Sequence, residues 1–243
     1  MNTDIRASRV PPLILIVTDR AVLAEVVQLA LRHGHFRTRV ALDVEDTLAA
    51  LAAVPPQLAI IDQDVGDGEI LGRLGYGSGD VDEERMPVLA LTRRGDLRTK
   101  LAAFEQGVDD ILTVPFSPEE LVARVLAIMR RAYHQPVPFS PALKFGELEI
   151  DILNRSVRVG GHELPLTSLE QNLLYLMAAN AGRLLTRDEI LDYLWGVDYI
   201  AESNVVDRHV RNLRAKLMND WHRPRYIATV PGKGYRFVPI SAD

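Results

Sequence analysis

Cysteine is absent from the 243-residue sequence, so the chain can form no disulfide framework, no thiolate metal site and no cysteine nucleophile. Long apolar runs are absent too, since none approaches the roughly 18–20 residues that a membrane-spanning helix needs. Residues 1–12 lack the charged and then apolar layout of a secretory signal. These absences favour a soluble, cytoplasmic protein with no membrane partner.

Positive charge is not in excess either. The chain has 28 Lys and Arg against 33 Asp and Glu, which gives a net charge of −5. Residues 1–140 carry the whole excess of negative charge, whereas residues 141–243 hold equal numbers of the two kinds. The composition therefore excludes a general attraction to nucleic acid, and any surface that binds a polyanion has to be local.

The length suits two domains of ordinary size, and the first is predicted at residues 10–133. Short apolar runs alternate there with segments of helical periodicity, as in a doubly wound parallel sheet. The predicted strands are 13–17, 38–41, 58–61, 87–91 and 110–114, and the predicted helices are 21–33, 44–54, 97–106 and 118–132. We expect an α/β domain of the flavodoxin-like type with five parallel strands. Six glycines between 66 and 85 favour a mobile, shortened third helix.

Ligands of such sheets bind at the carboxyl ends of the strands, so the residues at those ends carry the functional interest. They are Asp19, Asp62, Thr92 and Pro115. Two carboxylates that lie close together attract a cation. We therefore expect Asp19 and Asp62 to form an acidic pocket at this edge of the sheet.

A Pro-rich linker at 134–142 separates this domain from a second one at 143–240. Short antiparallel strands at 143–159 and 162–166 precede three helices at 168–180, 187–195 and 203–217. The first two helices each begin with a threonine three residues before a glutamate, which is a capping box: Thr167 with Glu170, and Thr186 with Glu189. This order of elements predicts a small α+β domain.

The third of these helices, 203–217, has two contrasting faces. One is an apolar stripe suited to bury against a core, formed by Val206, Val210, Leu213 and Leu217. The other carries Arg208, Arg211, Asn212 and Ala215. Arginine reads guanine edges or binds phosphates, asparagine suits adenine, and alanine allows close approach. Taken alone, however, this pattern favours an ordinary solvated amphipathic helix.

Two short strands that follow the helix change that interpretation. Residues 225–230 and 235–238 flank Pro231-Gly232-Lys233-Gly234, a Gly-rich hairpin with a cation at its tip. A helix followed by such a hairpin, or wing, indicates a DNA-binding protein. Because the second domain has no net charge, we expect strong binding only when two copies occupy one DNA.

Three blocks of the second domain resemble OmpR/PhoB-type response regulators in their order and spacing: LTSLEQNLLYLMAANAGRLLTRDEILDYLWG, VVDRHVRNLRAKL and VPGKGYRF. The resemblance implies an N-terminal receiver domain and a C-terminal winged helix-turn-helix domain, with 203–217 as its recognition helix. It implies that the loop Trp195–Glu202 contacts RNA polymerase. The DNA-binding residues expected from it are Asn204, Arg208, Arg211, Asn212, Arg214 and Lys233.

The receiver positions that matter in this family are only partly kept. The resemblance makes Asp62 the phosphoryl acceptor and Thr92 the hydroxyl that senses it. The family binds Mg²⁺ with two acids after the first strand, but here these positions are Thr18 and Asp19. Three further positions differ: Arg93 replaces a small residue, Ile111 an aromatic residue and Val114 a lysine.

A pocket without one carboxylate, the lysine and the aromatic residue lacks several groups on which phosphoryl transfer depends. We therefore expect a regulator that is largely independent of phosphorylation and requires no cofactor, with at most a weakened Mg²⁺ site at Asp19 and Asp62. The alternative is a conventional regulator that a sensor histidine kinase activates at Asp62 with Mg²⁺. A third hypothesis pairs the Arg93 guanidinium with Asp62 in place of the missing lysine.

The dimerisation face of the family is better kept than its phosphorylation site. Its positions in this chain are Lys100, Asp109, Asp110, Ile111, Glu120, Leu121, Arg124 and Arg131. We expect a homodimer through the receiver, bound to tandem or direct-repeat half-sites. The charged residues would set its register, and the apolar neighbours Ile111, Leu121 and Leu126 would add affinity.

Two other classes of function fit the sequence less well. A doubly wound domain can be an enzyme, such as a phosphatase or hydrolase, but no nucleophile–base pair or phosphate loop stands at any strand end, so we expect no enzymatic activity. A pure protein-interaction module is the other alternative. Specific retention of DNA in a salt titration distinguishes a DNA-binding regulator from it.

Overall fold

The computed structural model describes residues 11–68, 70–74, 85–93, 97–134, 139–196, 199, 204–218, 222 and 224–238. The chain divides into two compact units, with the main boundary between Phe139 and Ser140. This boundary falls within the linker expected at 134–142, of which residues 135–138 lie outside the described part.

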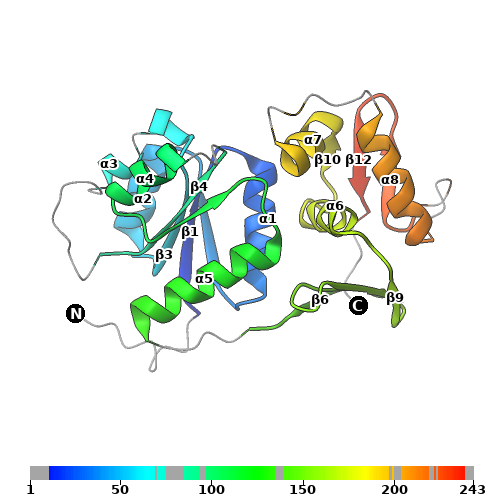
Figure 1. Ribbon diagram of the computed structural model, residues 1–243, viewed down its shortest axis with the longest axis horizontal. Coiled ribbons are helices and arrows are strands. Elements are labelled where there is room, and N and C mark those ends of the chain that lie inside the picture. The colour runs from blue at the N-terminus through cyan, green and yellow to red at the C-terminus, as the bar shows by residue number, and fades with distance from the viewer. Residues whose placement is uncertain are drawn as a thin grey trace. The chain divides into compact units, whose positions relative to one another are not determined.

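The first unit is built on a parallel sheet of five strands in the order β2-β1-β3-β4-β5. The strands are β1 (Leu13–Val17), β2 (Arg37–Ala41), β3 (Leu58–Asp62), β4 (Val88–Thr92) and β5 (Asp110–Thr113). The helices are α1 (Ala21–Arg32), α2 (Val44–Ala53), α3 (Ile70–Arg73), α4 (Leu97–Glu105) and α5 (Pro118–Tyr133). Figure 1 shows α1 and α5 on one face of the sheet and α2, α3 and α4 on the other. The predicted doubly wound fold is confirmed.

The three central strands explain why the sequence shows unbroken apolar runs. Every residue of β1, β3 and β4 is buried, because helices cover both faces of the sheet. Alternate residues point to opposite layers, so that Leu15, Val17 and Ile61 pack in one core cluster with Ile70 and Ala103. The edge strand β2 is only partly buried.

The third helix is short, as predicted. A 3-10 turn at Val65–Gly68 leads into α3, which has four residues. Mobility was predicted for 66–85, and residues 69 and 75–84 of that range lie outside the described part of the chain.

The second unit combines two small sheets with three helices. Its first sheet is antiparallel, with strands β6 (Ala142–Phe145), β7 (Leu148–Asp151), β8 (Ser156–Val159) and β9 (His162–Leu164). The remaining elements are α6 (Ser168–Ala179), β10 (Leu184–Thr186), α7 (Arg187–Trp195), α8 (Val205–Lys216), β11 (Ile227–Val230) and β12 (Gly234–Phe237). The winged helix-turn-helix arrangement is confirmed, and both capping boxes are formed.

The wing contains one strand that the sequence patterns did not predict. Strand β10 pairs antiparallel with β12, which also pairs with β11. Gly234 pairs with Thr186 of β10 and with Val230 of β11. A Cβ atom at position 234 would lie 2.1 Å from the carbonyl oxygen of Leu185. The backbone approach between β10 and β12 therefore requires glycine at position 234.

No helix in the described ranges is both long and apolar enough to cross a membrane.

Candidate functional site

The predicted acceptor pocket forms at the carboxyl ends of β1, β3 and β4. Asp62 is the last residue of β3, opposite Leu91 of β4. Asp62 and Thr18 are fully buried, and Thr92 is 3% exposed. The parallel register thus places Asp62 and Thr92 at the ends of neighbouring strands.

The carboxylate of Asp62 is engaged within the protein. Its Oδ2 atom accepts a hydrogen bond from Thr18 Oγ1 at 2.9 Å and another from Arg20 Nε at 2.8 Å. The Nη2 atom of Arg20 lies 2.7 Å from the same oxygen, which completes an ion pair. Oδ1 accepts a weaker bond from the backbone N–H of Asp64 at 3.3 Å.

Arg20 was not among the predicted site residues. It occupies the N-cap position of α1, where its backbone N–H donates to Thr18 Oγ1 at 3.2 Å. Its side chain is 22% exposed and turns back over the end of the sheet to Asp62. The only sequence signal was its place three residues after Val17, the last residue of the first strand, and next to Asp19.

The hypothesis that Arg93 pairs with Asp62 is wrong. Arg93 Nε lies 3.1 Å from Asp64 Oδ2, and Asp62 pairs with Arg20 instead. Arg93 follows β4 on the rim of the pocket, where the exposed carboxylate of Asp64 is its partner.

The residues around Asp62 do not fit a Mg²⁺ site. Asp19, the second predicted ligand, is exposed, whereas Asp62 is fully buried and its Oδ2 is held by a hydroxyl and a guanidinium. Val114 stands at the lysine position and is 6% exposed. Mg²⁺ prefers near-octahedral oxygen ligands with carboxylates among them, and nowhere in the described ranges do three His, Asp or Glu side chains gather to hold a metal.

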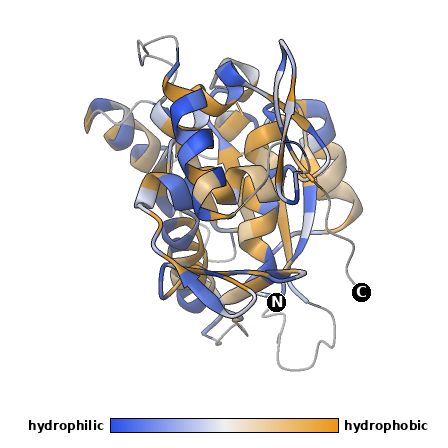
Figure 2. Cartoon of the chain, turned by 90° about the vertical axis from the view of Figure 1, so that its right-hand side faces the viewer, coloured by the Kyte–Doolittle hydropathy of each residue, from blue (hydrophilic) through white to orange (hydrophobic). Residues whose placement is uncertain are grey.

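The helix α8 separates its two faces as the periodicity predicted. The residues that face the core are buried: Val206, Val210, Leu213 and Leu217. Arg208, Arg211, Asn212 and Ala215 are exposed. Figure 2 colours the chain by hydropathy and shows hydrophilic and hydrophobic segments alternating along its helices. The cations of this face are therefore free to meet a phosphate backbone or base edges.

A polar cluster fixes α8 to its neighbours. Asp207 accepts a hydrogen bond from the Tyr235 hydroxyl of the wing and pairs with Arg187 Nε of α7 at 2.9 Å. The guanidinium groups of Arg187 and Arg214 lie 5.2 and 5.3 Å from the Tyr235 ring centroid. Burial, with the hydrogen bond to Asp207, raises the pKa of Tyr235 to about 12, so the hydroxyl remains a donor. This cluster joins α8 and the wing to α7.

The predicted DNA contacts differ in how free their side chains are. Asn204 is exposed at the N-cap of α8 and makes no capping bond, and Lys233 is exposed in the wing turn. Arg214 is instead tied to the wing sheet, since it donates to the Ile227 carbonyl at 3.1 Å and to Thr229 Oγ1 at 2.8 Å. Its contact with DNA stays a prediction, whereas its role in positioning the wing is visible.

The predicted loop Trp195–Glu202 is only partly described. Trp195 stacks with Tyr199 at a centroid distance of 5.9 Å and packs against His209 at 5.4 Å. The pKa of His209 is lowered by its burial and by Arg208. Residues 197–198 and 200–203 lie outside the described part, so contact with RNA polymerase stays a prediction.

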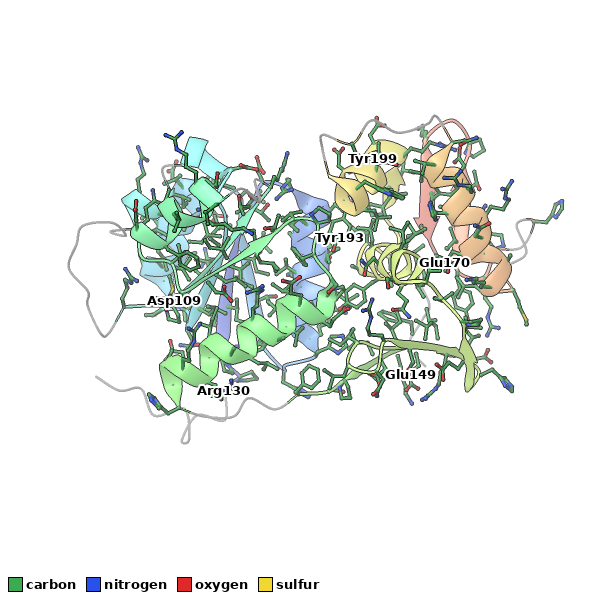
Figure 3. All side chains as sticks on the ribbon, viewed as in Figure 1. Asp109, Arg130, Glu149, Glu170, Tyr193 and Tyr199 are labelled. Carbon is green, nitrogen blue, oxygen red and sulfur yellow. The ribbon has the colours of Figure 1, made fainter. Side chains whose placement is uncertain are left out.

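The predicted dimerisation face carries charges that are already paired within the chain. Arg124 lies 2.8 Å from Asp110 Oδ2 and 2.8 Å from Glu120 Oε1. The Asp109 carboxylate accepts the backbone N–H of Val88 at 2.8 Å, and the side chain of Asp109 is labelled in Figure 3. Lys100 is half-buried and Arg131 is exposed.

The apolar part of the predicted face requires a correction. Leu121 is fully buried and Ile111 is 7% exposed, because both side chains belong to the core of the receiver. Exposed apolar residues occur on α4 instead: Leu97 is 72%, Leu101 52% and Phe104 48% exposed. Their spacings of four and three place them on one face of that helix, which the sequence patterns did not single out.

Both units match described families. Residues 14–126 match the family "Response regulator receiver domain", and residues 161–237 match "Transcriptional regulatory protein, C terminal". The two units therefore define a response regulator with a DNA-binding output domain.

Similar proteins extend the match over the whole chain. The transcriptional regulatory protein TrcR of Mycobacterium tuberculosis is 35% identical over 237 residues, which cover 96% of this chain and 90% of TrcR. The DNA-binding response regulator MtrA of Mycolicibacterium smegmatis is 34% identical over 229 residues, which cover 93% and 96% of the two chains. The solved structure of DrrB, an OmpR/PhoB homolog from Thermotoga maritima, is 28% identical with a TM-score of 0.44 and covers 94% of this chain and 99% of that one. The phosphate regulon transcriptional regulatory protein PhoB of Klebsiella pneumoniae is 32% identical over 224 residues, which cover 92% of this chain and 96% of PhoB. The chain belongs to the OmpR/PhoB-type response regulators.

Proposed function

We propose that the chain is a sequence-specific transcription regulator that binds double-stranded DNA as a receiver-mediated homodimer and acts largely without phosphorylation. The observation that carries the proposal is the division of α8 into a fully packed face and a face with Arg208 and Arg211 exposed. A helix anchored on one side and cationic on the other suits the major groove.

The anchoring of α8 supports specific rather than general binding. Asp207 connects it to α7 and the wing, and Lys216 connects its last turn to the start of α6. Base reading requires side chains held in a fixed register, which this network supplies. A wing with Lys233 at its tip can reach an adjacent minor groove.

Dimerisation is supported by the surface of α4. Three exposed apolar side chains on one face, Leu97, Leu101 and Phe104, are suited to burial against a second copy. Because the output domain lacks a net positive charge, avidity from two linked domains on tandem or direct-repeat half-sites would supply the affinity.

Independence from phosphorylation is supported by the acceptor pocket. Asp62 is buried and paired with Arg20, and neither Val114 nor Ile111 carries a group that could follow a phosphoryl group. A modification that interacts equally with two states cannot shift their balance. No dependence on a sensor histidine kinase or on Mg²⁺ is therefore expected.

The remaining partners follow from the family. We propose contact with RNA polymerase through Trp195–Glu202, a cytoplasmic location and no enzymatic activity. These stay predictions that the DNA-binding experiment does not address.

The test is site selection from a random DNA library, followed by binding isotherms on the selected site. Arg208→Ala or Arg211→Ala should weaken specific binding by about 1–3 kcal/mol if the arginine makes a bidentate base contact. Arg158→Ala is the matched control, since Arg158 is an exposed arginine on β8. Full affinity in both α8 variants would remove the assignment of the recognition helix.

The conventional regulator remains the second candidate, because the hydroxyl residue is kept: Thr92 is buried and directly follows Leu91, the register partner of Asp62. It predicts that a phosphodonor with Mg²⁺ tightens DNA binding through Asp62. The proposed function predicts no such change.

A further inference from the structure

The acceptor pocket contains two arginines that offset most of its negative charge. Three aspartates lie at this edge of the sheet: Asp19, Asp62 and Asp64. Arg20 pairs with Asp62 at 2.7 Å and Arg93 pairs with Asp64 at 3.1 Å. Asp19 is exposed to solvent. The local field that would draw a divalent cation toward the buried carboxylate is therefore largely cancelled.

Arg20 also occupies the space around the carboxylate oxygen. Its Nε and Nη2 atoms lie 2.8 and 2.7 Å from Asp62 Oδ2, and Thr18 Oγ1 lies 2.9 Å away. A divalent cation at its usual distance of about 2.1 Å from this oxygen would need the guanidinium to leave. Because Asp62 is fully buried, the cation could reach this oxygen only by breaking the ion pair and the hydrogen bond that Arg20 makes to it.

The geometry of Arg20 is fixed by its position in the chain. As the N-cap of α1 it is held by its N–H bond to Thr18 Oγ1, and its carbonyl accepts the first bond of the helix from Ala24 at 3.0 Å. A guanidinium remains charged across the working pH range of a protein. The counter-ion is therefore permanent.

We propose that Arg20 is a built-in counter-ion that takes the place of the divalent cation at Asp62 and keeps this receiver metal-free. This inference deepens the proposed function, because it gives a physical reason why the receiver acts without phosphorylation. It concerns only cation binding, so it can fail while DNA binding stands, and the reverse also holds.

The experiment titrates Mn²⁺, as a paramagnetic substitute for Mg²⁺, into the full-length chain and counts free Mn²⁺ by electron paramagnetic resonance. Wild type should show no saturable binding of Mn²⁺ at Asp62, so that wild type and Asp62→Asn give the same titration curve. Arg20→Ala should bind Mn²⁺ at least about tenfold more tightly than wild type does. The double variant Arg20→Ala with Asp62→Asn should lose that gain. Arg20→Lys, which retains a cation, should resemble wild type.

Arg93→Ala is the matched control, because it removes an arginine from the same pocket but not from Asp62. An equal gain in this variant would mean that bulk charge alone governs cation binding, and the proposal would be overturned. Saturable binding by wild type that depends on Asp62 would also overturn it.

A second measurement does not require Arg20→Ala to fold. The Nε–H proton of Arg20 should be protected from solvent exchange in the NMR spectrum of wild type and unprotected in Asp62→Asn. Mg²⁺ should leave this resonance unchanged in wild type. A resonance that shifts on addition of Mg²⁺ would show that the cation displaces the guanidinium, which contradicts the proposal.

Discussion

Lys216 Nζ lies 2.7 Å from Glu170 Oε2, and this contact joins the last turn of α8 to the first turn of α6. Glu170 is 4% exposed and also closes the capping box with Thr167. The Glu170 side chain is labelled in Figure 3. Helix α8, which carries the exposed arginines, is thus held by an ion pair whose carboxylate is buried. Removing one partner of such a pair destabilises the folded protein.

Glu170→Gln should lower the free energy of unfolding by about 1–3 kcal/mol, since the hydrogen bonds that Lys216 and Thr167 donate lose their charged acceptor. Burial alone would raise the pKa of Glu170, but hydrogen bonds from Lys216 and Thr167 hold it below its ordinary value. The difference in free energy of unfolding between wild type and variant should therefore be complete at pH values above the ordinary carboxyl pKa. It should vanish as the pH falls through the lowered pKa that Glu170 has in the folded protein. Denaturant unfolding at several pH values measures this. Glu163→Gln, at an exposed position, is the control, and an equal loss there would count against the ion pair.

Tyr235→Phe should loosen the wing without unfolding the domain. The substitution removes the hydroxyl that donates to Asp207 and keeps the ring that lies against Arg187 and Arg214. We expect a loss of about 1.5–3 kcal/mol in stability and weaker specific DNA binding. Absorbance titration of wild type should show one tyrosine ionising at about pH 12 that disappears in the variant. Unchanged stability and DNA affinity would show that the cluster does not position α8.

Lys233→Ala should weaken DNA binding less than either α8 arginine variant. Lys233 is exposed at the wing tip, where it would contact phosphate rather than bases. Removing one phosphate contact lowers the slope of log affinity against log salt by about one. Isotherms at several salt concentrations on specific and random DNA measure it. A loss confined to the specific site would indicate base reading by the wing instead.

Leu101→Glu should lower dimer affinity because a charge would enter the apolar face of α4. Lys100→Glu should act in the same direction, and it avoids the intrachain network that Arg124→Glu would break. Binding to two half-sites should fall more than binding to one. Leu153→Glu, at a 62% exposed position in the other domain, is the control. Sedimentation equilibrium that shows an unchanged dimer in both α4 variants would place the interface elsewhere.

The parts of this chain that sequence patterns predict are those governed by local periodicity. Continuous apolar runs marked β1, β3 and β4 because each is covered on two faces, and the stripe from Val206 to Leu217 marked the packed side of α8. The strand β10 was missed because three residues become a strand only through pairing with β12. Leu121 was placed on the surface although its side chain points into the core.

The missed contact between Arg20 and Asp62 has a different cause. Forty-two residues separate the two side chains, and no spacing rule connects an N-cap residue to the end of a later strand. Arg93, only one residue past the predicted hydroxyl of Thr92, was the nearer candidate by sequence, but its guanidinium reaches Asp64. Which arginine reaches a buried carboxylate depends on the direction of its side chain, and this follows only from the assembled fold.

The measurement that tests the central claim most directly is a DNA-binding isotherm with and without beryllofluoride and Mg²⁺, for wild type and for Asp62→Asn. A receiver whose acceptor is held by Arg20, and which lacks the lysine and the aromatic residue, should give four curves with the same affinity and the same dimerisation. A tenfold tightening, about 1.4 kcal/mol, in wild type that is absent from Asp62→Asn would contradict the account and show that the acceptor site still signals.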